Sequence, residues 1–219
     1  MKLRVILTGA TGMVGEGVLH ECLMHADVEE VLSVSRKPSG IPHQKLKEIL
    51  LPDFFRLSAI KDQLSGYNAC FFCLGVSSIG MKEPEYIKLT YELTLNFAKA
   101  LSDLNNMTFC YISGKSTDST EKGRSMWARV KGKTENELSK LGFKAVYHFR
   151  PGYMQPTPGL KRTLKGYKYI SWMYPFLRKV FPNMVSTLKE LGLAMINAGV
   201  KGYEKNILEV RDIKILAAE

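Results

Sequence analysis

Three glycines near the start of the chain have the spacing of a loop that binds phosphate groups. Gly9, Gly12 and Gly15 follow a short β-branched run directly and open an amphipathic stretch, the context that this motif requires. In such a loop the first glycine permits the tight turn, the second lets the backbone approach a pyrophosphate, and the third allows close packing of helix on strand. The sequence therefore predicts a dinucleotide site whose backbone N–H groups bind the pyrophosphate. The residues concerned are Gly9, Thr11, Gly12, Met13, Val14 and Gly15.

Two basic residues follow the second predicted strand. An NAD site normally has Asp or Glu here, about 20 residues past the loop, to bind the 2′-hydroxyl of the adenosine ribose. This chain has Arg36 and Lys37 instead. An arginine can stack on adenine and bind a 2′-phosphate through charge-assisted hydrogen bonds. We therefore expect NADP in preference to NAD; the alternative is a solvated basic turn.

The elements that must position these residues alternate along the first 150 residues. Short β-branched runs predict strands at 3–8, 30–35, 48–51, 69–74, 108–113 and 145–149. Apolar residues at helical spacing predict helices over 15–24 and 85–102. Strands separated by helices imply right-handed crossovers and a parallel sheet covered on both faces. The expected fold class is α/β, a Rossmann-type doubly wound parallel β-sheet.

The residue pattern of the sequence changes at Pro151. Prolines and glycines break the pattern into turns and short helices, followed by a longer predicted helix at 185–198 and a late strand at 206–210. This part is too short and proline-rich for an independent domain. We expect one domain, 1–219, with a cofactor-binding core at 1–150. A small C-terminal extension, 151–219, would lie over the carboxyl edge of the sheet, where ligands bind in such folds.

The composition is that of an ordinary globular protein. The chain has 219 residues, 45% of them hydrophobic, which excludes collagen-like, disordered and disulfide-scaffold classes. No apolar run reaches the roughly 18 residues that span a bilayer, and the N-terminal apolar run is too short for a secretory signal. These features favour a cytoplasmic protein. The net charge of +10 comes from residues 120–219, which hold 19 Lys and Arg against 8 Asp and Glu, so this half of the chain favours an anionic ligand.

Cysteines and histidines give no metal site. Cys70 and Cys73 form a C-x-x-C pair, but they lie in a predicted buried strand, where residues three apart face opposite sides. The two thiols should therefore not meet. The four histidines show no ligand spacing, so no metal is expected.

With these residues in hand, the chain resembles the short-chain dehydrogenase/reductase superfamily over nearly its whole length. The glycine spacing is that of its extended and atypical branches. Later landmarks follow in order: Cys73-Leu74-Gly75, Tyr111-Ile112-Ser113-Gly114, Val130-Lys131-Gly132 and Phe149-Arg150-Pro151-Gly152. Among atypical members, the Tat-interacting-protein-like NADPH-binding oxidoreductases are the most similar. The resemblance implies a cofactor across the carboxyl edge of the sheet, bordered by Leu74, Gly75 and Pro151, and a Ser/Thr, Tyr, Lys catalytic set.

This catalytic set is incomplete here. Lys131 matches the family lysine, which binds the nicotinamide ribose and lowers the pKa of the tyrosine. The tyrosine should lie four residues earlier, one helical turn away, but that position is Trp127, whose indole N–H cannot shuttle a proton. The alternative is that Trp127 only packs, in a core stripe with Val130, Thr134 and Leu138. Ser113 is the nearest serine.

Other residues offer partial substitutes. The alternative to Ser113 is that Gly114 occupies the position of the catalytic serine, with Ser116 or Thr117 as the replacement. The literal Y-x-x-x-K from Tyr111 to Lys115 runs off a predicted strand into a loop, so its two side chains lack the one-turn helical relation. We do not expect it to function.

A basic aromatic segment, residues 161–179, contains six Lys and Arg, five aromatic rings and no acid. Such a segment could form a lid over cofactor and substrate, with its rings packed inward. The alternatives are a peripheral membrane or protein contact, including a homodimer contact, and a solvated basic face. No nucleic-acid motif accompanies the charge, so no nucleic-acid partner is expected.

Together these features predict an NADP(H)-binding, epimerase-like member of the atypical short-chain dehydrogenase/reductases. Its reaction would be hydride transfer to a carbonyl or enone of a small-molecule substrate, with the proton supplied by water or by a lid hydroxyl such as Tyr153. The alternative is a catalytically weak regulatory or interaction protein that senses NADPH, because the binding residues persist while the proton donor does not.

Overall fold

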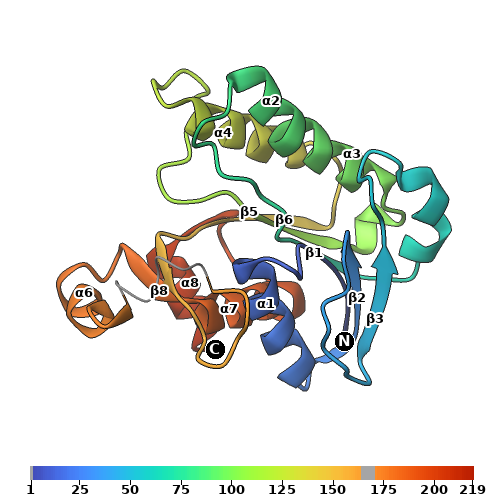
Figure 1. Cartoon of the computed structure of the whole chain (residues 1–219), viewed down its shortest axis with the longest axis horizontal. Coiled ribbons are helices and arrows are strands. Elements are labelled where there is room, and N and C mark those ends of the chain that lie inside the picture. Colours follow the sequence, from blue (N-terminus) through green and yellow to red (C-terminus); the bar gives the residue numbers. More distant parts are fainter. Residues whose placement is uncertain (1, 164–170) are drawn as a thin grey trace.

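The computed structural model describes residues 2–163 and 171–219, which contain a central sheet of seven parallel strands (Figure 1). The strand order is β3-β2-β1-β4-β5-β6-β9. The strands are β1 (Leu3–Thr8), β2 (Val28–Ser35), β3 (Leu46–Leu50), β4 (Ala69–Phe72), β5 (Thr108–Ile112), β6 (Ala145–Arg150) and β9 (Ile207–Glu209). Because the chain starts centrally, builds one edge and then returns to build the other, the order reverses between β1 and β4. This is the predicted Rossmann-type α/β fold.

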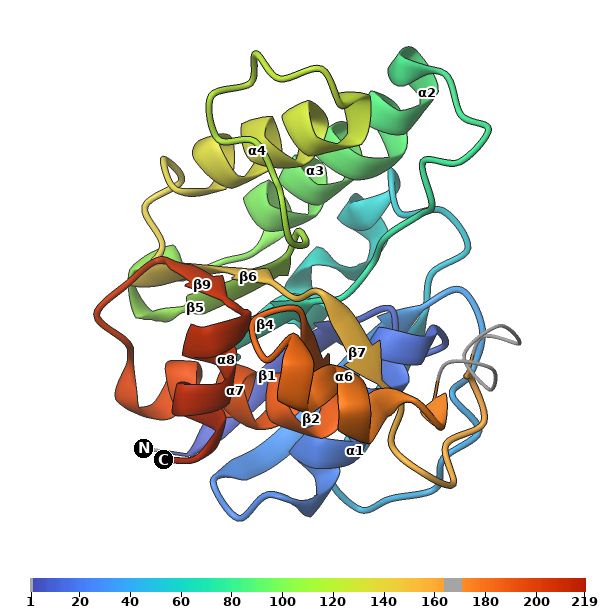
Figure 2. The same ribbon diagram turned by 90° about the vertical axis from the view of Figure 1, so that its left-hand side faces the viewer.

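Helices cover both faces of the sheet, as the two views in Figure 1 and Figure 2 show. One face carries α1 (Met13–Met24), α7 (Leu188–Lys201) and α8 (Val210–Ala217). The other carries α3 (Leu93–Ala100), α4 (Met126–Leu138) and the 3-10 helix η1 (Leu57–Leu64). Each face has its own buried apolar cluster, the first with Val18, Leu191 and Ile213, the second with Leu64 and Phe97. Burial on both faces explains why a central strand such as β4 is a continuous apolar run.

The predicted helix at 85–102 is a continuous helical path with an irregular centre. It consists of α2 (Glu83–Ile87), a π-helical turn η2 (Lys88–Glu92) and α3. Within this turn the hydroxyl of Thr94 donates to the carbonyl of Thr90 over 2.5 Å. A short helix, η3 (Leu104–Asn106), then leads into β5.

The predicted helix at 185–198 begins three residues late. Residues Val185–Thr187 form β8, which pairs in parallel with β7 (Tyr153–Gln155) as a separate two-stranded sheet. Thr187 then caps α7, because its hydroxyl accepts the N–H of Glu190 while the Glu190 carboxylate accepts the N–H of Thr187. Because the capping box makes Thr187 the N-cap, the helix begins at Leu188 and not at 185.

Only part of the 151–219 extension lies outside the main core. The strands β7 and β8 and the short helix α6 (Tyr174–Val180) lie beyond the end of β6. In contrast, α7, β9 and α8 complete the sheet and cover one of its faces, with Leu191, Leu208 and Leu216 fully buried. Residues 188–219 therefore belong to the core, and residues 151–187 form the extension proper.

The C-x-x-C pair lies as its strand position predicts. Cys70 belongs to the cluster on one face of the sheet, and Cys73, just past the end of β4, packs against the cluster on the other. The two thiols are free, and burial raises the pKa of both well above its usual value. Among the described residues, no helix is both long and apolar enough to cross a membrane, and no cluster of side chains could hold a metal ion.

Candidate dinucleotide-binding site

The glycine loop joins β1 to α1 at the centre of the sheet's carboxyl edge. Gly9 has φ +77°, and a Cβ there would lie 2.7 Å from the carbonyl oxygen of Cys73, which follows β4. A Cβ on Gly15 would collide with the carbonyl of Gly9. Both positions thus require glycine, the first for its conformation and the second for the contact between helix and loop. Gly12 differs, since a Cβ there meets nothing closer than 3.5 Å.

The start of α1 leaves backbone donors available. Gly12 is the N-cap, its N–H donates to the carbonyl of Gly9 over 2.9 Å, and its carbonyl accepts from Glu16 over 2.8 Å. The N–H groups of Met13 and Val14 have no acceptor in the part of the chain that the structure describes. Free amides at the positive end of a helix dipole can bind an anion such as a diphosphate.

Beside this loop lies a cavity of about 360 Å³ lined by Thr11, Arg36, Lys37 and Arg162. Arg36 and Lys37 directly follow β2, where the Ser35 hydroxyl donates to the carbonyl of Lys37 over 2.6 Å and holds the turn. Among the described residues, no carboxylate forms an ion pair with any of these three cations. We call this the cation cavity. It offers positive charge and a hydroxyl to an anion next to the loop.

A second cavity, of about 190 Å³, adjoins the first through Arg36, which lines both. Its walls are largely apolar and include Phe54, Phe55, Leu74 and Gly75. A narrow slot with aromatic and aliphatic walls beside an arginine suits a planar ring such as adenine. Leu74 and Gly75 therefore lie in the wall of this slot. The two phenylalanines follow β3 in an irregular segment, and no motif marked them in the sequence.

Lys131 lies on α4 at the carboxyl end of β5. Its Nζ is 3.4 Å from the carbonyl oxygen of Ile112 and also donates to the carbonyl of Ser113. Burial lowers the pKa of Lys131 to about 8, against an opposing effect of the Glu135 carboxylate. Trp127 precedes Lys131 by one turn and is half-buried, whereas Val130 and Thr134 are fully buried. Trp127 therefore lies at the edge of the packed stripe rather than inside it.

The hydroxyl of Ser113 belongs to a buried polar network. It donates to Glu135 Oε1 over 2.5 Å and lies 3.2 Å from the carbonyl oxygen of Phe149. The candidate replacements are placed differently. The Thr117 hydroxyl donates to the carbonyl of Gly114 over 2.7 Å, and Ser116 is exposed with φ +68° beside a cavity formed with residues 201–219.

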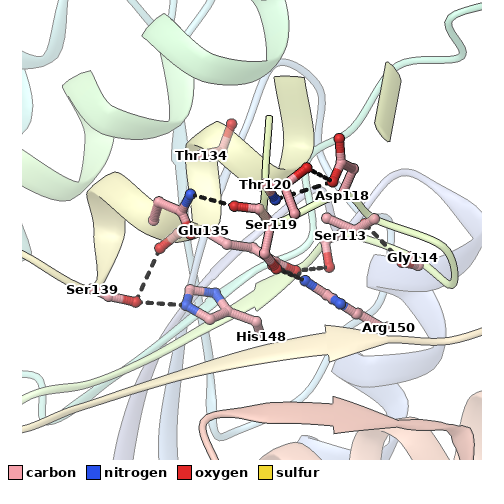
Figure 3. Close-up of polar contacts among 12 residues, drawn as sticks. Ser113, Gly114, Asp118, Ser119, Thr120, Thr134, Glu135, Ser139, His148 and Arg150 are labelled. Atoms are coloured by element: carbon pink, nitrogen blue, oxygen red, sulfur yellow. Dashed lines mark hydrogen bonds and ion pairs between the residues drawn. The ribbon is translucent and has the colours of Figure 1, made fainter. Parts of the chain in front are cut away.

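The network around Ser113 joins α4 to β6 (Figure 3). Glu135 and Arg150 are 2% and 9% exposed and form an ion pair in which both guanidinium Nε and Nη2 donate to the carboxylate. Arg150 Nη2 also donates to the Ser119 hydroxyl over 2.6 Å. Burial lowers the pKa of the neighbouring His148 to about 4, so its imidazole is neutral at pH 7. The carbonyl of Pro151, the next residue on from Arg150, accepts the N–H of Lys115 over 2.9 Å.

The Tyr111–Lys115 pair is excluded as a catalytic pair. Tyr111 is 1% exposed within the core, and burial raises the pKa of its phenol far above the usual value. Lys115 lies past the end of β5, beside the same cavity as Ser116. The structure thus confirms the sequence-based exclusion of this pair.

In the part of the basic aromatic segment that the structure describes, two of the rings are exposed. Trp172 and Phe176 are 76% and 62% exposed, so the prediction of inward-packed rings is wrong for both. Arg178 Nη2 lies 2.7 Å from Glu190 Oε1 on α7, and its Nη1 donates to the hydroxyl of Tyr174. The ion pair between Arg178 and Glu190 joins α6 to α7. Of the predicted members, Lys165, Tyr167, Lys168 and Tyr169 lie outside the described residues.

No protein family model matches the chain. Among solved structures, it is similar to the Bordetella bronchiseptica enzyme WbmF in complex with NAD⁺, with a TM-score of 0.66 at 15% identity, over 99% of this chain and 77% of that one. The chain therefore shares the Rossmann fold of that enzyme.

Curated relatives define the family more closely. The chain is 30% identical over 218 residues to the protein fmp52, mitochondrial, of Aspergillus fumigatus, covering 93% of this chain and 89% of the relative. It is 27% identical over 218 residues to the protein of the same name from Emericella nidulans, covering 93% and 90%. The chain belongs to the Fmp52 family. Because these relatives are named as mitochondrial proteins, the expectation of a cytoplasmic protein is wrong. Composition does not distinguish one compartment inside the cell from another.

Proposed function

We propose that this chain binds NADP(H) across the carboxyl edge of its sheet and transfers a hydride between this cofactor and a carbonyl or enone. The observation that carries the proposal is the continuity of three features. The glycine loop with its free amides adjoins the cation cavity, and the cation cavity shares Arg36 with the apolar slot. A dinucleotide with an adenosine phosphate matches this order: a ring, a phosphate beside it, and a diphosphate bridge.

Different residues bind different parts of the cofactor. The slot holds adenine, Arg36 and Lys37 bind the adenosine 2′-phosphate, and the amides of Met13 and Val14 bind the diphosphate. Lys131, at the end of β5, holds the nicotinamide ribose, with Pro151 bordering the same half. When bound, NADPH supplies a hydride from C4 of its nicotinamide. WbmF, which shares this fold, binds NAD⁺, and the basic residues after β2 are what support NADP here.

A second candidate function is an NADPH-sensing protein that catalyses weakly or not at all. It is favoured by the position of Trp127, one turn before Lys131, together with the engagement of the Ser113 hydroxyl by Glu135. Turnover separates the two candidates. NADPH oxidation above the protein-free rate with any of a panel of quinones and aldehydes supports the enzyme, and a rate at the baseline with every compound supports the sensor.

The proposed location comes from the relatives, and the expected partners come from the sequence. We propose a mitochondrial location because the relatives in the Fmp52 family are named so. The particular similarity to Tat-interacting-protein-like oxidoreductases, the peripheral membrane or protein contact through 161–179, and the homodimer stay predictions.

We expect Arg36→Ala to weaken NADPH binding by about 10- to 100-fold, since a hydrogen bond to a charged group contributes roughly 1.5–3 kcal/mol. The affinity for NADH should fall much less, because NADH has no 2′-phosphate and loses only its stacking on the guanidinium. Isothermal titration calorimetry with both cofactors measures this. The control is Lys47→Ala, which removes a cation on β3 that pairs with Glu30 over 2.6 Å and does not line the cavity. Tighter binding of NADH than of NADPH by the unaltered protein would contradict the NADP assignment.

A further inference from the structure

Glu16 is a buried carboxylate in an unexpected place. It lies in the first turn of α1, directly after the glycine loop, and is only 5% exposed. A carboxylate there disfavours a diphosphate on the same loop through charge repulsion. Its two oxygens are instead engaged by distant backbone. Oε1 accepts the N–H of Lys161 over 3.1 Å, and Oε2 accepts the N–H of Arg162 over 2.7 Å.

These two hydrogen bonds fix the extension against the loop. They join residues about 145 positions apart, so they are not a consequence of local helix capping. Backbone N–H groups that donate to a carboxylate form charge-assisted bonds, which are stronger than neutral ones. Glu16 therefore sets where the main chain at 161–162 lies relative to α1.

The side chains of the two residues held by Glu16, Lys161 and Arg162, line different cavities. Arg162 lines the cation cavity with Thr11, Arg36 and Lys37. Lys161 lines a separate cavity formed within the extension by residues such as Pro156 and Thr163. One side chain thus faces the loop and β2, while the adjacent side chain, of the same charge, does not.

Three cations around one cavity repel one another unless an anion lies among them. In the described part of the chain none of the three is paired with a carboxylate. Arginine presents a planar fork of donors that matches phosphate oxygens. Arg162 comes from the extension, whereas Arg36 and Lys37 follow β2. The arrangement encloses a phosphate from two elements rather than one.

We propose that Arg162 binds the adenosine 2′-phosphate of NADP(H) as a third cation, and that Glu16 is the positioning residue that holds it there. This inference rests on the proposed function. It makes the selectivity between NADPH and NADH depend on the C-terminal extension as well as on β2.

The test compares Arg162→Ala with the matched control Lys161→Ala, titrating NADPH and NADH into each by calorimetry. Arg162→Ala should weaken the binding of NADPH by about tenfold or more and the binding of NADH by less than about twofold. Only NADPH loses a charge-assisted hydrogen bond in this variant. Lys161→Ala removes the same charge one residue away and should leave the ratio of the two affinities unchanged.

Glu16 is tested through that ratio rather than through affinity alone. Glu16→Ala removes both acceptors and should lower the NADPH/NADH selectivity as far as Arg162→Ala does. Glu16→Gln keeps one acceptor, so its selectivity should lie between that of the unaltered protein and that of Glu16→Ala. Combining Glu16→Ala with Arg162→Ala should lower the selectivity no further, since Glu16 acts through Arg162. If Glu16 had a merely structural role, Glu16→Ala would weaken the binding of both cofactors equally.

Three results would overturn the inference while leaving nicotinamide binding intact. They are equal binding of NADPH and NADH by the unaltered protein, equal losses for both cofactors in Arg162→Ala, and equal losses of selectivity in Arg162→Ala and Lys161→Ala. If the unaltered protein binds neither cofactor, the proposed function fails as well. The outcomes thus separate the two claims.

Discussion

Trp127→Tyr is expected to raise NADPH-dependent carbonyl reduction by about 10²- to 10⁴-fold, the range that a positioned general acid contributes. The substitution places a phenol one turn before Lys131 on α4. Burial keeps the pKa of Lys131 at about 8, so at neutral pH most of the lysine is protonated and favours an ionised phenol beside it. The measurement is the initial rate of NADPH oxidation with a panel of quinones and aldehydes.

Trp127→Phe is the matched control for this experiment. It removes the indole and opens similar space, but it supplies no proton donor. We expect its rate to remain at that of the unaltered protein. An equal gain with phenylalanine would show that the bulk of the indole, and not the missing hydroxyl, limits the reaction. No gain with tyrosine would mean that the cofactor does not reach Lys131 as proposed.

Glu135→Gln is expected to lower the free energy of unfolding by about 3–5 kcal/mol, the usual effect of removing one partner of a buried ion pair. The guanidinium of Arg150 would then be left with Glu209, 3.7 Å away, and the hydroxyl of Ser119. Because domains of this kind have roughly 5–15 kcal/mol of stability in total, the loss is a large fraction of it. Equilibrium unfolding in urea, followed by circular dichroism, measures the change.

The same helix offers a control. Glu137 lies two residues further on and pairs with Lys140 over 2.7 Å at the surface. We expect Glu137→Gln to leave the stability within experimental error, since solvent screens exposed pairs. Replacing both buried partners, with Glu135→Met and Arg150→Met together, should destabilise far less than the two single changes would in sum. A small effect of Glu135→Gln, similar to that of Glu137→Gln, would contradict the buried-pair interpretation.

The fold could be predicted from the sequence because its determinants are local. The strands buried on both faces are short apolar runs, and the loop between β1 and α1 requires glycine at 9 and 15 for reasons of backbone contact. The errors occurred where pairing over a long range decides the structure. Residues 185–187 form a strand only because residues 153–155 lie beside them.

The candidate site was predictable in part for the same reason. Arg36 and Lys37 follow a strand at a fixed distance from the loop, so sequence position alone indicates them. Phe54, Glu16 and Arg162 are brought to the site by tertiary contacts, and no motif marks them. The basic segment 161–179 did contain Arg162, but its composition could not show that this one cation turns toward the phosphate loop. Composition also could not show that Trp172 and Phe176 are exposed.

The most direct test of the central claim is calorimetric titration of NADPH into the unaltered protein and into Gly12→Ala. A Cβ at position 12 meets nothing in the protein closer than 3.5 Å, so this variant should fold, while its methyl group would lie where the diphosphate must approach the loop. We predict saturable binding at one site in the unaltered protein and binding at least about tenfold weaker in Gly12→Ala, as expected when contacts to a charged group are lost. Failure of the unaltered protein to bind NADPH or NADH, or equal binding by Gly12→Ala, would contradict a dinucleotide site at this loop.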